Sequence, residues 1–157
     1  MKTVFIVNKA LLFACVSMYF GTGWSLVLFT FPIAPKLTPD NYYNQFVPQV
    51  MAATQFFTYM TMVMMVCSAV FIVEKWRSPD KWYPIVVLLL VVAATALTIY
   101  FIFEYNERMA AGITDPIELK TVLNKWMFLN VIRVSLWTLQ WLTLMTYFSI
   151  ALKRQRA

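Results

Sequence analysis

The chain has no histidine among its 157 residues, and this absence removes several common chemistries at once. Without imidazole, histidine ligation of haem or di-iron and Ser-His or Cys-His nucleophile pairs are excluded. The sequence also has no glycine-rich phosphate loop, no dinucleotide-binding motif and no carboxylate cluster with metal-ligand spacing. We therefore expect the protein to use no metal and no cofactor.

Charged residues are scarce as well, at 13% of the chain, whereas hydrophobic residues make up 61%. This composition excludes an ordinary soluble domain. The two cysteines, Cys15 and Cys67, fall in apolar runs, where a cysteine is most often a small buried hydrophobe. The methionines of residues 60–65 raise the question of a copper(I) site, but their spacing scatters the sulfurs around a helix. We expect them to fill gaps in a core.

Long apolar runs dominate what is present. Each reaches the roughly 20 residues that a helix needs to cross about 30 Å of hydrocarbon. The sequence therefore predicts an all-α fold, an integral membrane four-helix bundle that forms a single transmembrane domain over residues 1–157. The expected spans cover residues 10–34, 50–73, 84–103 and 128–152.

The distribution of lysine and arginine predicts the topology. With four crossings, eight of the 13 basic residues lie on the side of the termini and the middle loop, four lie on the other side, and Arg133 is the thirteenth. The positive-inside rule then places both termini in the cytoplasm, and we expect a bacterial inner membrane. The net charge of +6 belongs mostly to that face and does not indicate nucleic-acid binding.

The two outer connections carry helix start and stop signals. In the first, residues 35–48, Pro39 is typical of a first helical residue, and we expect a short amphipathic segment lying on the membrane. In the second, Gly112 is a helix stop, and Asp115 and Pro116 are typical of the cap and first turn of the last helix.

Arg133 lies inside the fourth apolar run, where a guanidinium is costly and is usually paired and functional. Glu104 is twenty residues beyond Pro84, and Arg133 is twenty residues before Lys153, so both should reach the outer edge of the hydrocarbon core. We therefore expect a Glu104–Arg133 ion pair between consecutive helices, with Glu107 as the alternative carboxylate one turn further out.

Helical spacing groups other polar and aromatic residues at the same level. Positions separated by three or four residues share one face of a helix. We expect these faces to form an outer-leaflet pocket suited to a small amphipathic ligand. The predicted pocket residues are Trp126, Asn130, Arg133 and Trp137 on the fourth helix, Tyr100 and Glu104 on the third, and Gln55 and Tyr59 on the second.

A structural interpretation competes with this pocket. Polar groups in membrane bundles often only hydrogen-bond across helices, and an arginine near the interface can snorkel. For Gln55 and Tyr59 the structural interpretation is the favoured one. We also expect close helix packing along a ridge of small residues, Ser17, Gly21 and Ser25.

Short motifs around the third and fourth spans suggest a family. Residues 103–112 include Asn106 just after the third span, and Trp126 with the downstream Arg133 opens the fourth. In these positions the chain resembles the anthrone-oxygenase-like family of small four-helix membrane proteins. The resemblance implies cofactor-free oxygenation of a polycyclic phenolic substrate, an activity named for a few members. Asn130 stands where a histidine is common in the family, and a proline usual near Asn106 is absent.

Two classes of function follow from these observations. The first is an outer-leaflet site, with or without an oxygenase-like activity, for a lipophilic quinone-like or phenolic molecule. Arg133 would stabilise an oxyanion, Glu104 would position Arg133 or move protons, and Asn106, Trp126 and Asn130 would shape the pocket. The alternative is an accessory subunit of a larger membrane protein complex, or a homo-oligomer. Membrane lipids are expected partners in both cases. A transporter is a weaker third option, because broken helices and paired half-repeats are missing from the sequence.

Overall fold

The computed structural model describes residues 2–156, and the side chains of residues 3–154. This part of the chain is helical and contains no strand. The elements are, in order, α1 (Lys2–Ser25), the π-helix η1 (Leu26–Thr30), the 3-10 helix η2 (Ala34–Lys36), α2 (Tyr42–Lys75), the 3-10 helix η3 (Pro79–Lys81), α3 (Trp82–Leu97), the π-helix η4 (Thr98–Ile102), α4 (Phe103–Ala110) and α5 (Pro116–Arg156).

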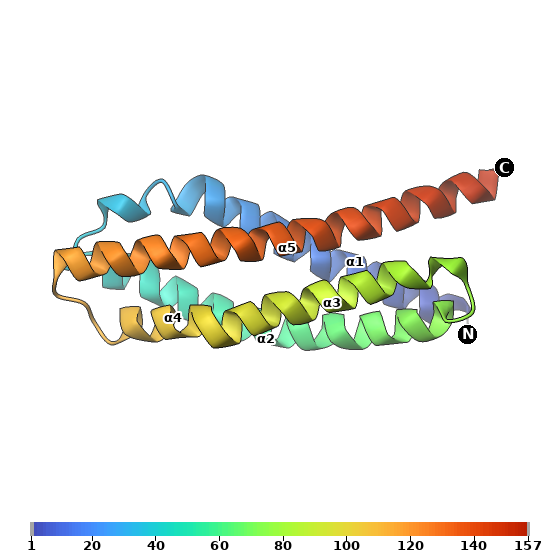
Figure 1. Cartoon of the computed structure of the whole chain (residues 1–157), viewed down its shortest axis with the longest axis horizontal. Coiled ribbons are helices and arrows are strands. Elements are labelled where there is room, and N and C mark those ends of the chain that lie inside the picture. Colours follow the sequence, from blue (N-terminus) through green and yellow to red (C-terminus); the bar gives the residue numbers. More distant parts are fainter. Residues whose placement is uncertain (1, 157) are drawn as a thin grey trace.

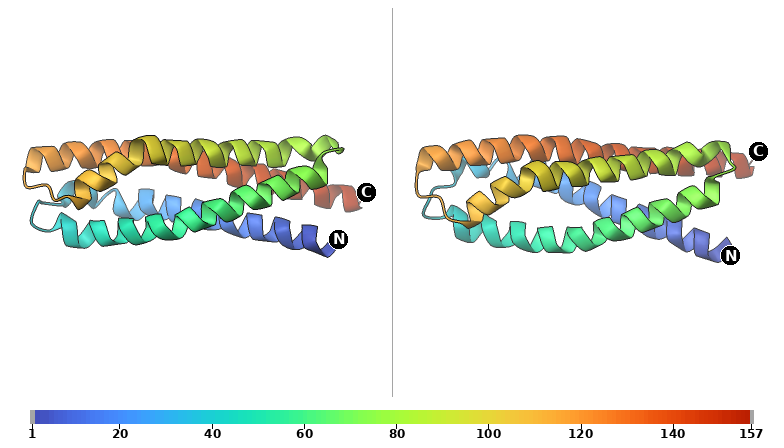
Figure 2. Two further views of the ribbon diagram at one scale, coloured as in Figure 1. Left: turned by 90° about the horizontal axis from the view of Figure 1, so that it is seen from below. Right: turned by 60° about the horizontal axis from the view of Figure 1, so that its bottom comes forward.

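The helices run lengthwise beside one another and form an elongated molecule (Figure 1). The helix α1 packs against α2 and α5, and α3 packs against the same two helices from the other side. Both termini lie at one end, together with the connection between α2 and α3 (Figures 1 and 2). We call this the termini end, and we call the opposite end, which holds the α1–α2 and α4–α5 connections, the loop end.

Three helical segments are long and apolar enough to cross a membrane, as expected of a membrane protein: Thr3–Thr30, Tyr42–Lys75 and Pro79–Ala110. The surface agrees with lipid contact, because large hydrophobic side chains such as Phe29 and Leu89 are more than 60% exposed. The helix α5 falls outside this group. Its run of apolar residues is interrupted by polar side chains, among them Asn130, Arg133 and Gln140.

Two hydrophobic clusters fill the interior, one towards each end. The termini-end cluster is built around Leu12, Phe71 and Leu144, and the loop-end cluster around Tyr42 and Met109. The Tyr42 hydroxyl donates a hydrogen bond to the Met109 carbonyl at 3.1 Å and accepts one from the Ile113 amide at 2.5 Å. These bonds fasten the start of α2 to the α4–α5 connection.

The first connection differs from the sequence-based expectation. We predicted a separate amphipathic segment within residues 35–48, but residues from Tyr42 onward form the first turns of a continuous α2. The prediction was wrong because Tyr42, Phe46 and Val47 are buried in the loop-end cluster and hold these turns in line with the rest of the helix. Their burial outweighs the single backbone hydrogen bond that Pro48, inside α2, cannot donate.

The second connection matches its expectation. Gly112 has a φ of 90°, a conformation that favours glycine, and it follows the last turn of α4. The helix α5 begins at Pro116, and the Asp115 carboxylate accepts a hydrogen bond from the Ile117 amide at 3.0 Å. The predicted stop and start of these helices are therefore confirmed.

Among the glycines, Gly23 packs most closely against a neighbouring helix, because a Cβ atom there would lie 2.8 Å from the Trp137 ring. The expected ridge of Ser17, Gly21 and Ser25 does not make this contact, since a Cβ at Gly21 would have no atom within 4 Å. The predicted close packing is therefore not formed at Gly21, and the glycine that packs closely is Gly23, two residues or roughly 200° away around α1.

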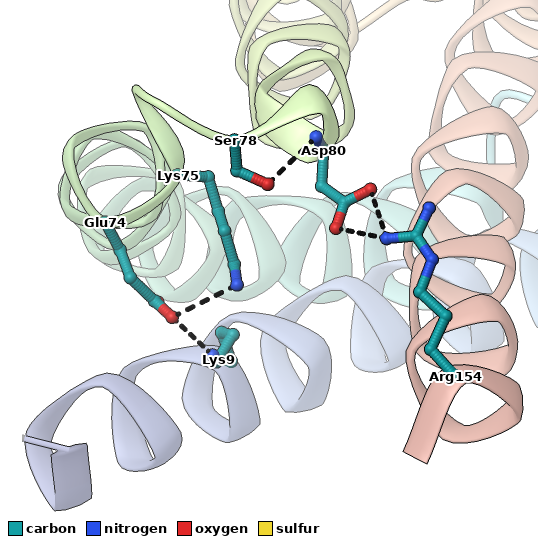
Figure 3. A network of polar contacts seen from close by, with 6 residues as sticks. All are labelled: Lys9, Glu74, Lys75, Ser78, Asp80 and Arg154. Atoms are coloured by element: carbon teal, nitrogen blue, oxygen red, sulfur yellow. Dashed lines mark hydrogen bonds and ion pairs between the residues drawn. The ribbon is translucent and has the colours of Figure 1, made fainter. Parts of the chain in front are cut away.

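Charged side chains connect the helices at the termini end (Figure 3). The Lys9 ammonium of α1 lies 2.7 Å from the Glu74 carboxylate of α2, and Lys75 lies 3.6 Å from the same carboxylate. The Arg154 guanidinium of α5 donates to both oxygens of Asp80 in η3, at 2.9 and 2.8 Å. Each of these cations therefore has a carboxylate partner.

Candidate functional site

A cavity of about 530 Å³ lies between the two hydrophobic clusters. Helices from all parts of the fold line it, and its walls combine apolar side chains with hydroxyl, amide and guanidinium groups. This size and this composition are usual for small-molecule sites.

Both π-helices contribute to the cavity wall, η1 through Leu26 and Thr30 and η4 through Thr98 and Ile99. Single π-helical turns interrupt a helix and occur frequently at functional sites. The helix α2 packs against α3 and α4 but makes few contacts with η4 between them.

Exposed lining residues mark an opening of the cavity between α2 and η4. Thr58 and Met62 of α2 and Ile99 of η4 line the cavity and are also exposed on the outside of the molecule. The cavity therefore opens sideways, towards the surface that contacts lipid in a membrane.

Arg133 of α5 reaches this cavity as a half-buried side chain. Its guanidinium donates to the Asn130 side-chain oxygen through Nη2 and to the Thr98 hydroxyl through Nη1, at 3.5 Å in the second case. The guanidinium carbon lies 4.7 Å from the centre of the Trp137 ring, in a cation–π arrangement. Among the residues that the structure describes, the buried Nε atom has no hydrogen-bond partner.

Local sequence explains how these partners are held. Asn130 precedes Arg133 by three residues on the same helix face, and its amide nitrogen donates to the Trp126 carbonyl at 2.8 Å. That bond leaves the Asn130 oxygen to accept from Arg133. The Thr98 hydroxyl donates to the Ala94 carbonyl at 2.8 Å, so its oxygen can likewise accept.

Asn106 and Trp126 close the loop end of the cavity. The Trp126 indole nitrogen donates to the Asn106 side-chain oxygen at 2.8 Å, which joins α5 to α4. The Trp126 ring also packs edge-on against Phe46 of α2, with 4.9 Å between ring centres. Asn106 and Trp126, which were both predicted as pocket residues, line the cavity. Asn130 was also predicted, but it lies outside the lining and accepts a hydrogen bond from the Arg133 guanidinium.

The expected Glu104–Arg133 ion pair is not formed. Within residues 3–154 no carboxylate lies within ion-pair distance of Arg133, and Glu104 is exposed. The reason is the register between the antiparallel helices, in which Arg154 meets Asp80 and Arg133 meets Thr98. Thr98 precedes Glu104 by six residues, so the carboxylate lies about 9 Å further along the helix. The alternative partner, Glu107, lies further still and is also exposed.

Three other predicted ligand-binding residues lie outside the cavity lining. Tyr100 is 75% exposed, Tyr59 is 64% exposed, and Gln55 is exposed as well. The helix α2 instead presents the neighbouring face, with Thr54 and Thr61, to the cavity. In a membrane helix the lipid-facing side is as apolar as the packed side, so spacing alone did not identify the inward face of α2.

Sequence reasoning missed Tyr19, Thr98 and Gln140, which all line the cavity. The Tyr19 hydroxyl donates to the Phe57 carbonyl at 2.7 Å and lies 2.5 Å from the Thr61 hydroxyl, with no local motif that would have revealed it. Gln140 did have a signal, because it continues the inward stripe of α5 three residues beyond Trp137.

Comparisons of the chain with protein-family models, with curated proteins and with solved structures gave no match. The cavity offers one guanidinium, an aromatic wall and several hydroxyl groups, and its described lining contains no carboxylate. Such a site can bind a negatively charged or strongly polarised oxygen on an otherwise apolar molecule.

Proposed function

We propose that this protein binds a lipophilic quinone-like or phenolic molecule in the cavity and that Arg133 holds an acidic oxygen of that molecule. The observation that carries the proposal is the environment of Arg133, whose guanidinium meets only neutral partners and an aromatic ring among the described residues. A guanidinium at membrane depth is costly unless an anion accompanies it. A bound oxyanion would supply that counter-charge.

We further propose the membrane arrangement in which this site operates. In it α5 crosses the membrane beside α1 and α3, which makes four crossings, with both termini in the cytoplasm of a bacterial inner membrane. The excess of lysine and arginine at the termini end supports this orientation. Arg133 and the cavity would then lie in the outer half of the bilayer, and a lipophilic ligand would enter sideways between α2 and η4.

Each residue has a distinct part in the proposed site. Arg133 binds the oxygen, Asn130 and Thr98 hold the guanidinium in place, and Trp137 forms a flat wall against which a ring can pack. Trp126 closes the loop end. Glu104 has no part, because its carboxylate lies outside the site.

The resemblance to the anthrone-oxygenase-like family extends this proposal from binding to reaction. A phenol bound as its phenolate at Arg133 would be the electron-rich form that reacts with O₂. If a ring CH₂ group of that molecule is oxygenated, one atom of O₂ would become the new C=O oxygen and the other would leave as water with the two hydrogens of that carbon, so that O₂ is the only oxidant needed. Stabilisation of that oxyanion is the contribution the guanidinium would make.

A matched pair of probes tests the binding proposal. 2-Hydroxy-1,4-naphthoquinone is ionised at neutral pH, and its 2-methoxy analogue has the same rings without the charge. Titration calorimetry on the detergent-solubilised protein, with empty micelles as the blank, should give an affinity roughly tenfold to a hundredfold higher for the ionised probe.

The variant Arg133→Gln should abolish this preference. Arg108→Gln is the matched control, because it removes a guanidinium that pairs with Glu118 at the loop end, outside the cavity lining. Equal binding of both probes to the unaltered protein, or an unchanged preference in Arg133→Gln, would contradict the proposed function.

A second candidate function, an accessory subunit or a homo-oligomer, has one specific observation in its favour. Gly21 is exposed and a Cβ atom there would meet no atom within 4 Å, so this position of α1 remains available to another helix. If another helix packs there, Gly21→Leu should release a co-purifying partner in native gel electrophoresis while leaving probe binding unchanged. An unchanged migration would remove this candidate.

A further inference from the structure

We infer that Gln140 is a second ligand-binding residue of the cavity. The ligand would therefore carry two polar ends, an acidic oxygen for Arg133 and a neutral hydroxyl or carbonyl for Gln140. This inference rests on the proposed function, because it assumes that Arg133 holds one end of a ligand.

The first observation is the state of the Gln140 amide. Gln140 is fully buried, at 0% exposure, and lines the cavity. Neither its oxygen nor its nitrogen has a hydrogen-bond partner in the part of the chain that the structure describes. Buried polar side chains in proteins are almost always hydrogen-bonded, and leaving a whole amide without partners is costly. A ligand group in the cavity would satisfy it.

The second observation is the position of Gln140 relative to Arg133. The two residues are seven apart on α5, so they share one helix face and their backbones are about 10 Å apart along the axis. Both line the same cavity, Arg133 nearer its loop end and Gln140 nearer its termini end. One elongated molecule can therefore contact both side chains.

The wall between these two residues is aromatic. Trp137 lies between them on the same face, and its ring packs edge-on against Tyr19 with 4.7 Å between ring centres. Phe57 packs against the same tryptophan at 6.3 Å. A flat, ring-containing body of two or three rings suits both this wall and the volume of the cavity.

The amide also determines the kind of polar group at the second end. A primary amide both donates and accepts hydrogen bonds but carries no charge, so it pairs well with a hydroxyl or a carbonyl. The two ends of the ligand are thus distinguished chemically, with the charged end at Arg133 and the neutral polar end at Gln140.

Two probes that differ only at the far end test the inference. 4′-Hydroxybiphenyl-4-carboxylate has a carboxylate for Arg133 and a hydroxyl two rings away, and biphenyl-4-carboxylate lacks the hydroxyl. Titrated into the solubilised full-length protein, the hydroxylated probe should bind about threefold to tenfold more tightly.

Variants assign this difference to a residue. Gln140→Leu should make the two probes bind equally, whereas the control Gln55→Leu, at an exposed glutamine outside the cavity lining, should preserve the difference. Arg133→Gln should lower the affinity for both probes by the same factor. If Gln140→Leu does not fold, Gln140→Met keeps the length of the side chain, and the comparison in the unaltered protein needs no variant.

The outcomes separate the two proposals. Suppose that both probes bind equally to the unaltered protein and that neither binds to Arg133→Gln. This result overturns the role of Gln140 and leaves the Arg133 site intact. A difference that persists in Gln140→Leu also overturns it. If neither these probes nor the ionised naphthoquinone binds, the proposed function fails and this inference fails with it.

Discussion

The cations at the termini end and the cation in the centre of the molecule differ in their partners. At the termini end, Lys9 lies against Glu74 and Arg154 against Asp80, so these cations have carboxylate partners on neighbouring elements. In the centre, Arg133 meets only an amide, a hydroxyl and a tryptophan ring among the described residues. The first arrangement is complete without a ligand, whereas the second has a cation without its counter-charge.

This difference separates structural charges from the one that we connect with function. A paired charge near the membrane surface joins helices and contributes modestly to stability. A cation inside the bundle without a carboxylate partner brings a desolvation cost that the fold itself does not offset. Charged groups inside membrane bundles usually belong to functional sites, so the central arginine and the termini-end pairs should respond differently to mutation.

The largest effect is expected from reversing the central charge. Arg133→Glu places a carboxylate where the ligand oxyanion is proposed to bind, so the affinity for 2-hydroxy-1,4-naphthoquinone should fall by more than roughly a hundredfold. Calorimetric titration would measure it. Affinity within about threefold of that of the unaltered protein would place the probe elsewhere.

Breaking the more buried of the termini-end pairs should give the next largest effect, and it should act on stability. Lys9 and Glu74 have side chains that are only 17% and 15% exposed, and Glu74→Gln leaves the Lys9 ammonium without its carboxylate. The free energy of unfolding should fall by about 1–2 kcal/mol, with probe binding unchanged. Unfolding in mixed micelles with increasing SDS provides the measurement. An unchanged unfolding midpoint would show that this pair is not structural.

Removing the central charge, in contrast, should not lower the stability of the protein. Arg133→Met replaces a cation that has no carboxylate partner within residues 3–154 with an apolar side chain of similar length, and this should leave stability unchanged or raise it by up to about 1 kcal/mol. The same unfolding assay applies. A loss of 2 kcal/mol or more would mean that Arg133 is a structural residue, which is the competing interpretation of this site.

The smallest effect is expected at the exposed pair. The Arg154 side chain is 58% exposed, so solvent screens its interaction with Asp80. Arg154→Gln should lower the free energy of unfolding by less than about 0.5 kcal/mol, and added salt should remove even this difference. A larger loss would indicate that the α5 end is held to η3 more tightly than a surface ion pair allows.

Much of the fold could be predicted from the sequence because membrane thickness imposes long apolar runs. The second, third and fourth predicted spans fall inside α2, the α3–η4–α4 segment and α5, and Gly112 and Pro116 mark a real helix end and start. Pro39 was misleading, because a proline in a turn and a proline at a helix start look alike in sequence. Only the burial of Tyr42 shows where α2 begins.

The candidate site was predicted in part, and the errors share a cause. On α5 the repeated spacing of three and four residues correctly identified the face that carries Trp126, Asn130 and Arg133. The partner across the interface was wrong, because equal distances from Pro84 and Lys153 do not determine the register between two helices. That register depends on contacts such as Arg154 with Asp80, which only the folded chain reveals.

The Nε–H group of Arg133 offers the most direct test of the central claim, since this buried atom has no partner among the described residues. Its resonance can be identified in a ¹⁵N–¹H spectrum of the solubilised protein by its disappearance in Arg133→Gln. Addition of 2-hydroxy-1,4-naphthoquinone should move this resonance, and the 2-methoxy analogue should not, because only the ionised probe accepts a strong hydrogen bond from the guanidinium. A resonance that stays in place with the ionised probe at saturation would contradict anion binding at Arg133.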